Sequence, residues 1–507
     1  MAEIALEMKG ITKTFGSTVA NKDVNLTVYK GEILALLGEN GSGKTTLMNM
    51  IAGIYHPDSG EIFAYGKKVQ IRGPKDAYEN KIGMVHQHFK LIDVFTAAEN
   101  VALGIENEKF NLKETAAKVK DIADRYGFEF RPEQKVYDMS VSQKQSLEIM
   151  KQLYRGCDIL ILDEPTAVLT PQETEKLFAV IRNMKKDGKS IIIITHKLHE
   201  VMEVSDRVAI LRKGEFIAAV NTAGTSENEL TEMMVGRKIE LNISRPDRKN
   251  RTERIRIDHL TCKNSEGLIA LDDVSFNAFG GEILGIAGIS GCGQKELLEA
   301  VAGLQKCEDG SEITYLSPQG EEISLVGKNP KKIRDLGIAL SFVPEDRLGM
   351  GLVGGMGMTD NMLLKKYSKG HGAFVNKKES KELAEEIVEE LEVVTPSIQT
   401  PLRLLSGGNI QKVLVGREIS SQPTVLLTAY AVRGLDINTS YTIYDMLNEQ
   451  KEKGVAVIYV GEDLDVLLAL CDRILVLCSG KVSDIVDGRS ATKEEVGLLM
   501  TSIRKGA

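Results

Sequence analysis

The sequence lacks any apolar run that approaches the roughly 18 residues of a membrane span, so we expect no transmembrane segment. Its first residues, MAEIALEMKG, have no basic region, apolar core or cleavage site, and we expect no secretory signal. Positive charge is not in excess either, because the net charge is -8, which argues against bulk attraction to nucleic acid or anionic lipid. The six cysteines lack metal-ligand spacing and are expected to be reduced thiols that fill the core.

What the sequence does contain is a second copy of itself. The stretch VNLTVYKGEILALLGENGSGKTTLMNMIAG from Val24 matches VSFNAFGGEILGIAGISGCGQKELLEAVAG from Val274. Further along, SDRVAILRKGE from Ser205 matches CDRILVLCSGK from Cys471. Copies of this size indicate two homologous domains rather than a short-period solenoid.

We place the two domains at residues 4–240 and 254–503. The polar and basic segment Arg237–Glu253 has no clear period and is predicted to be a short linker. Strand-like runs such as Ser190–Thr195 alternate with longer helical patterns such as Pro171–Lys185. This alternation predicts α/β domains with a largely parallel sheet.

One stretch of the first copy, GENGSGKT, fits the phosphate-binding pattern G-x-x-x-x-G-K-[ST]. It follows an apolar strand (Ile33–Leu37) and opens a helix (Thr46–Ile51), which is the context that the pattern requires. Glycines let several backbone N–H groups point at one phosphate chain, and the helix N-terminus adds a positive field. Lys44 supplies a charge for the β- and γ-phosphates, and Thr45 offers a hydroxyl to Mg²⁺. The predicted nucleotide-binding residues are Gly38, Glu39, Asn40, Gly41, Ser42, Gly43, Lys44, Thr45 and Thr46.

Polar residues follow several of the other apolar strands. Asp163 ends the run ILILD and is predicted to hold Mg²⁺, and Glu164 is predicted to take a proton from the attacking water, an effect on the order of 10²–10⁴-fold. We expect His196, after SIIIIT, to sense the γ-phosphate and Gln87 to contact Mg²⁺ and the water. Phe15 is predicted to stack on adenine. The ordinary alternatives are a solvated strand end, a structural histidine, a surface amide and a buried aromatic.

Taken in order, these residues resemble the motifs of ABC ATPases. A further segment, LSGGN, resembles the signature of that family, and the resemblance covers nearly the whole chain twice. It implies two tandem P-loop ABC ATPase domains of α/β fold that pair head to tail, so that each nucleotide lies between the phosphate loop of one copy and the signature of the other. The residues expected to face the first loop are Leu405, Ser406, Gly407, Gly408 and Asn409.

The tandem form with a degenerate second copy is similar to the ATP-binding subunits of bacterial importers for simple sugars and nucleosides. MVHQHFKLIDVFTAAENVALG (Met84–Gly104) and EVGLLM (Glu495–Met500) resemble the nucleoside branch, whereas ribose and galactose relatives usually read nearer to QELNL after the glutamine. A simple-sugar cargo remains the alternative. The resemblance implies ATP and Mg²⁺, two separate transmembrane permease subunits, an extracytoplasmic substrate-binding lipoprotein, and a peripheral location at the cytoplasmic face of the membrane.

The second copy has lost the residues that would do chemistry. Gln294 stands at the position of Lys44, and Lys295 at that of Thr45. In LLTAYAV, Ala429 and Tyr430 replace the acidic pair.

Three further positions of the active first copy also have replacements in the second. We place Ser265 opposite Phe15, Glu345 opposite Gln87 and Glu462 opposite His196.

For the signature segments the pattern is reversed, because the second copy keeps the motif and the first does not. LSGGN is intact in the second copy, whereas the first copy reads MSVSQ (Met139–Gln143), with Val141 and Ser142 in place of the glycines. Head-to-tail pairing would put every loss into one composite site. We therefore predict one hydrolytic site and one structural site.

Two other classes of protein are compatible with a phosphate loop. Soluble tandem ABC ATPases that act on nucleic acid or ribosomes usually keep both sites and carry a long basic linker, so we expect no nucleic-acid partner. P-loop kinases and GTPases need no LSGG, and no N-K-x-D appears where a GTPase would carry it.

Overall fold

The computed structural model describes residues 3–16, 18–87, 89–104, 111–167, 169–236, 243–247, 251–264, 266–289, 291–342, 351–364, 377–420, 423–461 and 463–502. They divide into two compact units, Met1–Glu240 and Leu241–Ala507. Among the described residues, no helix combines the length and the apolar character needed to cross a bilayer.

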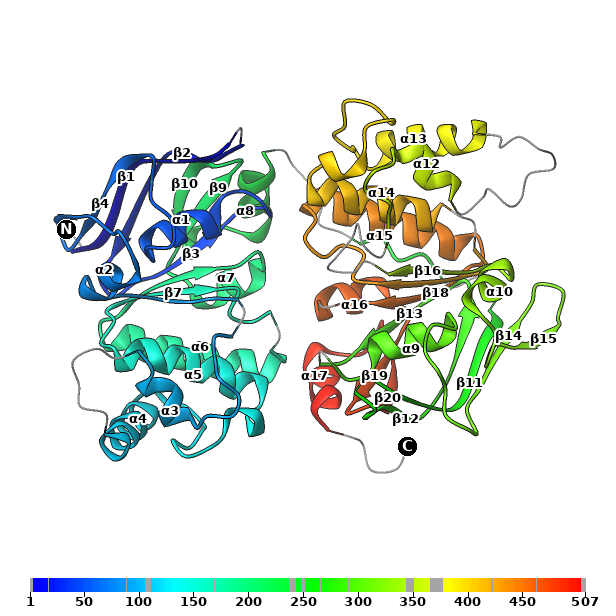
Figure 1. Cartoon of the computed structure of the whole chain (residues 1–507), viewed down its shortest axis with the longest axis horizontal. Helices are drawn as coiled ribbons and strands as arrows, with labels where there is room; N and C mark the ends of the chain where they lie inside the picture. The colour runs from blue at the N-terminus through cyan, green and yellow to red at the C-terminus, as the bar shows by residue number, and fades with distance from the viewer. Residues whose placement is uncertain are drawn as a thin grey trace. The chain divides into compact units, whose positions relative to one another are not determined.

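The first unit contains two sheets (Figure 1). A four-stranded antiparallel sheet has the order β2 (Thr18–Tyr29), β1 (Ile4–Phe15), β4 (Ser59–Ala64) and β5 (Lys67–Val69). A six-stranded sheet has the order β10 (Glu215–Asn221), β9 (Arg207–Arg212), β3 (Ile33–Leu37), β8 (Ser190–Ile194), β7 (Ile159–Asp163) and β6 (Ile82–Val85). Its strands run parallel except at β10.

The central strands of this sheet are apolar throughout because both of their faces are covered. Ile191 and Ile193 of β8 belong to one core cluster, whereas Ile192 and Ile194 belong to another. Successive side chains of a strand point to opposite faces, so a run such as SIIIIT serves two cores at once. This arrangement confirms the predicted α/β fold with a largely parallel sheet.

Eight helices are described in the first unit. Figure 1 shows α3, α4 and α5 grouped at one end of the unit, away from the antiparallel sheet. The helices are α1 (Lys44–Ile51), α2 (Pro74–Glu79), α3 (Ala97–Ala102), α4 (Leu112–Tyr126), α5 (Val141–Tyr154), α6 (Pro171–Lys186), α7 (Leu198–Val204) and α8 (Glu227–Val235).

The second unit repeats this architecture, as the duplicated sequence predicts. Its antiparallel sheet has the order β12 (Ile269–Gly280), β11 (Thr252–Lys263), β14 (Glu312–Leu316) and β15 (Glu322–Ser324). Its six-stranded sheet has the order β16 (Ile338–Phe342), β17 (Val425–Ala429), β18 (Ala456–Val460), β13 (Glu282–Ala287), β19 (Arg473–Cys478) and β20 (Lys481–Asp487). The described helices are α9 (Gln294–Val301), α10 (Pro330–Asp335), α12 (Met358–Leu363), α13 (Lys378–Glu390), α14 (Gly407–Ile419), α15 (Ile437–Glu452), α16 (Leu464–Leu470) and α17 (Lys493–Thr501).

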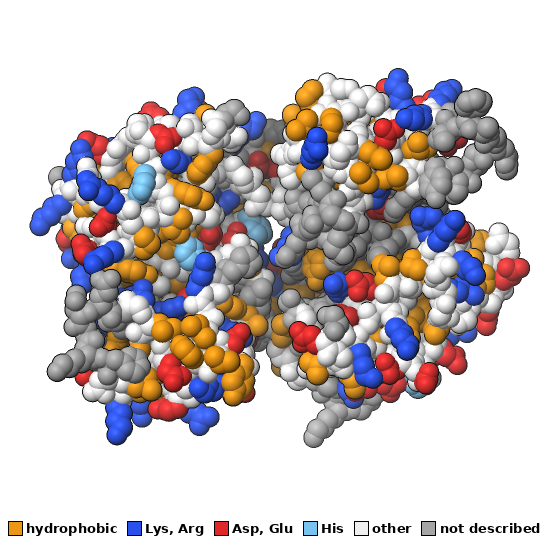
Figure 2. Space-filling view, in the orientation of Figure 1, with side chains coloured by type: hydrophobic (Ala, Val, Ile, Leu, Met, Phe, Trp, Pro, Cys, Tyr) orange, Lys and Arg blue, Asp and Glu red, His pale blue; other side chains and the backbone are white. Residues whose placement is uncertain are grey.

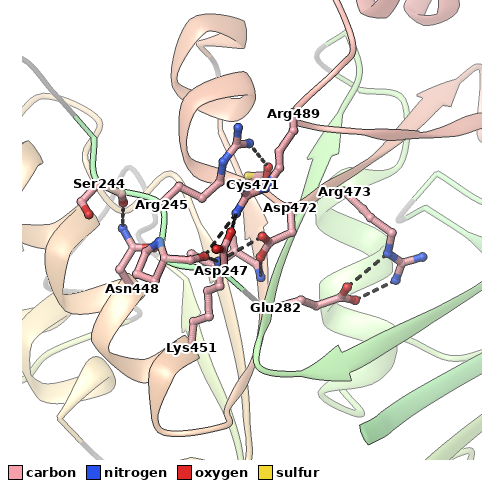
Figure 3. A network of polar contacts seen from close by, with 12 residues as sticks. Ser244, Arg245, Asp247, Glu282, Asn448, Lys451, Cys471, Asp472, Arg473 and Arg489 are labelled. Carbon is pink, nitrogen blue, oxygen red and sulfur yellow. Dashed lines mark hydrogen bonds and ion pairs between the residues drawn. The ribbon is translucent and has the colours of Figure 1, made fainter. Parts of the chain in front are cut away.

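Residues 243–247, which lie in the predicted linker, bind to the second unit (Figure 3). Arg245 donates hydrogen bonds to the carbonyl oxygens of Leu468 (3.0 Å) and Cys471 (2.6 Å). Lys451 of α15 donates to the carbonyl oxygen of Pro246 (2.6 Å) and pairs with Asp472 (3.0 Å). This segment therefore forms part of the second unit.

The docked segment accounts for a difference in burial between the two units. The Lys451 and Asp472 side chains are 1% and 0% exposed. The matching pair in the first unit, Lys185 and Asp206, is 37% and 38% exposed. The same ion pair is thus a buried element in one unit and a surface element in the other.

Candidate nucleotide site

The phosphate loop of the first unit connects β3 to α1. Gly43 precedes the helix with φ +92°, and a Cβ on it would lie 2.3 Å from the carbonyl oxygen of Ala20. A Cβ on Gly38 would lie 2.3 Å from the carbonyl oxygen of Leu211. Both positions therefore require glycine, because any other side chain would collide with backbone. The helix begins at Lys44, two residues before the predicted start.

The Lys44 side chain is folded into this loop. Its ammonium donates to the carbonyl oxygens of Gly38 (2.6 Å) and Glu39 (2.9 Å), and the residue is 6% exposed. Burial lowers the pKa of Lys44, although the charges of Glu164 and Asp163 oppose the shift. Among the described residues, the buried Ser42 hydroxyl has no hydrogen-bond partner. A buried cation next to an unpartnered hydroxyl suits an anionic ligand.

Asp163, at the carboxyl end of β7, lies beside the loop and is 6% exposed. Burial, followed by the charge of Glu164, raises the pKa of Asp163 to about 6, while a hydrogen bond with Thr45 and the charge of Lys44 oppose the rise. A carboxylate and a hydroxyl side by side are the oxygen ligands that Mg²⁺ prefers.

Glu164 follows in a left-handed backbone conformation, with φ +49°. Its N–H donates to the carbonyl oxygen of Ile194 (2.9 Å), and its carboxylate contacts Nδ1 of His196 (2.9 Å). The surrounding protein would lower the pKa of His196, but the hydrogen bond and charge of Glu164 raise it. The pair can accept and hold a proton close to Lys44.

The strand order explains why these residues meet. The neighbouring parallel strands β3, β8, β7 and β6 place the phosphate loop, His196, the acidic pair and Gln87 at the same edge of the sheet. Gln87 is exposed and lies two residues after the end of β6. Asn40 and Thr45 reach solvent, whereas Thr46 is half-buried in the first turn of α1.

Phe15 lies at the end of β1 and is 44% exposed. Its ring contacts Tyr55 edge to face, with ring centroids 5.2 Å apart. The sequence prediction missed Tyr55, since no motif singles out an aromatic residue after α1. It also missed the fully buried Asn21, whose amide donates to the carbonyl oxygen of Gly43 (3.2 Å). The local sequence does not single out Asn21, because the residues that follow it in β2 are polar too.

The model of one protein family, ABC transporter, matches residues 21–167 and 271–428. The chain belongs to the ABC transporter family. As an ATP-binding protein of that family, it is an ATPase.

Several relatives match this ABC ATPase over nearly its whole length. It is 44% identical to the guanosine import ATP-binding protein NupO of Bacillus subtilis (strain 168), over 98% of this chain and 97% of the relative. The nucleoside import ATP-binding protein NupA of Lactococcus lactis subsp. cremoris (strain MG1363) is 40% identical, over 98% of each chain. The ribose import ATP-binding protein RbsA of Clostridium tetani (strain Massachusetts / E88) is 36% identical, over 97% of this chain and 96% of the relative.

Among solved structures, the archaeal ribosome recycling factor aABCE1, crystallised with the ribosomal stalk protein aP1, matches with a TM-score of 0.58. It is 17% identical, and the match covers 92% of this chain and 87% of that one. At this identity the likeness shows the shared fold alone.

In the second ABC unit the described residues of the phosphate loop keep the backbone conformation but not the side chains of the first. Gly293 has φ +100° and precedes α9, as Gly43 precedes α1. Gln294 donates its amide to the carbonyl oxygen of Ile289 (3.0 Å), which replaces the contact of Lys44 with Glu39. The neighbouring Lys295 pairs with Glu299 one helical turn later (3.7 Å).

The strand end of the second unit also keeps its shape. Ala429 is fully buried at the end of β17, and Tyr430 has φ +55°, close to the value of Glu164. The N–H of Tyr430 donates to the carbonyl oxygen of Val460 (3.0 Å), as that of Glu164 does to Ile194. The left-handed conformation persists although no acid remains.

The prediction that placed Ser265 opposite Phe15 is wrong by one residue. The N–H of Asp23 donates to Thr12 (3.0 Å) in the first unit, and that of Asp273 donates to Thr261 (3.1 Å) in the second. Counting from these matched threonines puts Asn264 opposite Phe15.

Ser265 lies outside the described residues, as do the replacements proposed at Glu345 and Glu462.

The signature segment Leu405–Asn409 lies in the second unit, where it begins α14. Ser406 is the N-cap and accepts from the Asn409 N–H (3.4 Å) and from the Asn409 side chain (2.9 Å). Ser406 and Gly407 are exposed, Gly408 and Asn409 are half-buried, and Leu405 packs on the core. In the first unit, Ser140 caps α5 in the same manner.

Proposed function

We propose that this ABC ATPase is the energy-coupling subunit of an importer, with one hydrolytic site and one degenerate site. In this proposal the phosphate loop of the first unit faces Leu405–Asn409 of the second. The supporting observation is how the replaced motif residues are distributed between the two units. The unit that lacks the lysine and the acidic pair keeps LSGGN, while the unit with the catalytic residues carries MSVSQ.

The proposed binding of ATP uses the contacts available at the loop edge. The ammonium of Lys44 would exchange its carbonyl partners for the β- and γ-phosphates, and the loop N–H groups would bind the phosphate chain. Phe15, supported by Tyr55, would stack on adenine. Ser406 at the start of α14 would present its hydroxyl and the N-terminal N–H groups of the helix to the γ-phosphate from the other unit.

Thr45 and Asp163 would hold Mg²⁺, with Gln87 as a further ligand. A hydrogen bond links Thr45 to Asp163, so a hydroxyl and a carboxylate lie side by side for the ion. When bound, Mg²⁺ neutralises charge on the phosphate oxygens.

Glu164 would act as the general base for the attacking water. Its carboxylate is fixed by the left-handed backbone and by His196, so the base is oriented before the nucleotide arrives. His196 would in turn sense the γ-phosphate. Hydrolysis and release would then reopen the paired domains, because ATP binds the closed state better than the open one.

The test of this proposal is Glu164→Gln in the full chain. We expect ATP turnover to fall by on the order of 10²–10⁴-fold while binding of Mg-ATP stays within twofold, because the amide keeps the shape and removes the base. Lys295→Ala is the matched control, since that side chain is 52% exposed in the degenerate loop. Unchanged turnover in Glu164→Gln would contradict the role of Glu164.

Exposed apolar side chains near Gln87 are the proposed contact with a membrane partner. In the first unit, the side chains of Ile92, Val94 and Tyr137 are 42%, 65% and 62% exposed. The backbone of Ile92 is held by both side-chain atoms of the buried Asn100, at 2.8 and 3.1 Å. Ile92 and Val94 follow Gln87 in the sequence, and the N–H of Tyr137 donates to the carbonyl oxygen of Asp93 (3.1 Å). The three side chains would receive a short cytoplasmic helix of a permease.

In the second unit the matching residue is Val353, which is 42% exposed. Its N–H donates to the side-chain oxygen of the buried Asn361 (2.8 Å), and the Asn361 amide donates to its carbonyl oxygen (3.1 Å). An exposed apolar residue held by a buried asparagine recurs in both units, which is consistent with two permease subunits and an extracytoplasmic lipoprotein receptor acting through them. The subunit would then lie at the cytoplasmic face of the membrane. Figure 2 shows positive and negative side chains interspersed on the visible face of each unit, which gives no support to a nucleic-acid partner.

A nucleoside is the cargo that we favour, since the relatives named for guanosine and nucleoside import are more similar to this chain than the one named for ribose import. Uptake of labelled guanosine and labelled ribose would separate the two. Cells that lack their own import ATPase subunit should regain guanosine uptake with this chain and not with Glu164→Gln. Regained uptake of ribose alone would support the sugar alternative.

A further inference from the structure

Behind the catalytic strand ends of the first unit lies a second set of polar contacts. Thr166 comes two residues after Glu164, and Glu200 comes four residues after His196, in α7. The Thr166 hydroxyl donates to one oxygen of the Glu200 carboxylate (2.6 Å). Lys197 pairs with the other oxygen (3.1 Å) and donates to the carbonyl oxygen of Thr166 (3.3 Å).

These three residues join the two segments that carry the catalytic pair. At the front, Glu164 is bound to His196 (2.9 Å) and to the backbone of Ile194 (2.9 Å). At the back, Thr166 is bound to Glu200 and Lys197. Glu164 has a left-handed backbone, which is unfavourable for a residue with a side chain and persists only when its surroundings hold it. The contacts of Thr166 with Glu200 and Lys197 hold the backbone two residues after Glu164.

The contacts are also largely shielded from water. Thr166 is 1% exposed and Glu200 is 9% exposed. A carboxylate in such a place is unfavourable unless its oxygens are bound, and here both are. Hydrogen bonds to a charged group in a partly buried site are strong and directional, so they restrain position more tightly than apolar contact does.

The second unit shows that the fold itself does not need these contacts. The positions of Thr166 and Glu200 are taken by Val432 and Val466, and both valines pack against the hydrophobic core of that unit. The position of Lys197 is taken by Asp463, whose side chain accepts from the N–H of Asp465 at the start of α16. Where the acidic pair is absent, apolar packing has replaced the Thr166–Glu200 contact, and the residue at the Lys197 position caps a helix instead.

We propose that Thr166, Glu200 and Lys197 are positioning residues for hydrolysis, which hold the Glu164 segment and the His196 segment at a fixed separation. This inference rests on the roles proposed above for Glu164 and His196. None of the three residues touches the nucleotide in this account. Their effect should therefore appear in kcat and not in the affinity for ATP.

The experiment introduces the valine pair of the second unit into the first, as Thr166→Val with Glu200→Val in the full chain. We expect kcat to fall by about 10- to 100-fold with KM for ATP within twofold, as for a base displaced by a fraction of an ångström. Thr166→Ser keeps the hydroxyl and should retain kcat within about threefold. Glu203→Gln is the matched control on α7, because Glu203 pairs with Arg182 on the surface (2.8 Å), and its kcat should not change.

A second variant separates positioning from folding. Lys197→Gln removes a half-exposed partner and should lower kcat several-fold without changing the thermal unfolding temperature. The proposal is overturned if the double-valine variant keeps kcat. It is also overturned if Lys197→Gln loses activity only in proportion to its loss of folded protein, while Thr166→Ser has a kcat as low as the double-valine variant. If Glu164→Gln itself keeps full turnover, the proposed function fails; if only the valine variant does, this inference alone fails.

Discussion

The two phosphate loops of this chain differ in side chains far more than in backbone. Gly43 and Gly293 adopt the same left-handed conformation, and so do Glu164 and Tyr430. Since the second unit has kept these conformations without the catalytic side chains, the loop and strand end are stable features of the fold. The two units therefore differ in the charged and hydroxyl side chains that they place on a similar backbone, and we propose that this difference separates a hydrolytic site from a degenerate one.

Removing the loop cation should have the largest effect and should differ most between the units. Lys44→Ala takes away the only ammonium inside the first loop among the described residues, and we expect ATP turnover to fall by more than about 100-fold. Gln294→Ala at the matched position should change turnover by less than about twofold. ATPase assays of both variants test this contrast, and equal losses would contradict a single hydrolytic site.

The second-largest difference between the units is expected in the stability effect of two matched ion pairs, Lys451–Asp472 and Lys185–Asp206. Lys451→Ala leaves Asp472 buried without its cation under the docked residues 243–247, and should cost about 3–5 kcal/mol. Lys185→Ala breaks an exposed pair and should cost about 0–1 kcal/mol. Denaturant unfolding of each variant measures the difference.

A comparable cost for the two ion-pair variants would mean that the docked segment does not shield the Lys451 pair in solution. Removing the segment's own anchor, as Arg245→Ala, should destabilise the chain in the same direction and by a smaller amount.

A smaller effect is expected of pH on the affinity for Mg²⁺ at Asp163 in the first unit. Asp163 has a pKa raised to about 6, so it takes up a proton as the pH falls through 6, and a protonated carboxyl cannot bind Mg²⁺ well. The affinity for Mg²⁺ should decrease by about tenfold per pH unit below 6. Because the folded state holds this proton more tightly than the unfolded state, the ionised Asp163 also makes the metal-free protein less stable as the pH rises towards 6.

Titration of Mg²⁺ against a fluorescent ATP analogue at pH 5 and pH 7.5 checks this dependence. Asp163→Asn should abolish it. A dependence that survives in Asp163→Asn would assign the proton to another group.

Local patterns sufficed to predict much of the fold and part of the site. The apolar run at Ser190–Thr195 ends within one residue of the observed β8, because a strand covered on both faces needs an unbroken apolar run. The glycine-rich pattern located the phosphate loop because the backbone of that loop admits only glycine at certain positions. These signals are contained in a few adjacent residues.

Features that depend on distant partners were not predictable. Nothing adjacent to Arg245 indicates that it binds the backbone of α16, more than 200 residues further along the chain. Thr166 and Glu200 likewise meet only because β7 and β8 are neighbours in the sheet. Such contacts require the tertiary structure, because their residue types are ordinary when read locally.

The central claim, that one site is built from both units, is tested most directly at the signature serines. Ser406→Arg should reduce ATP turnover by more than about 100-fold, although this residue lies in the unit without catalytic acids, because a large side chain would displace the γ-phosphate. Ser140→Arg, at the matched cap of α5, should leave turnover within about twofold. Normal hydrolysis by Ser406→Arg, or loss of turnover in Ser140→Arg instead, would contradict a site built from both units.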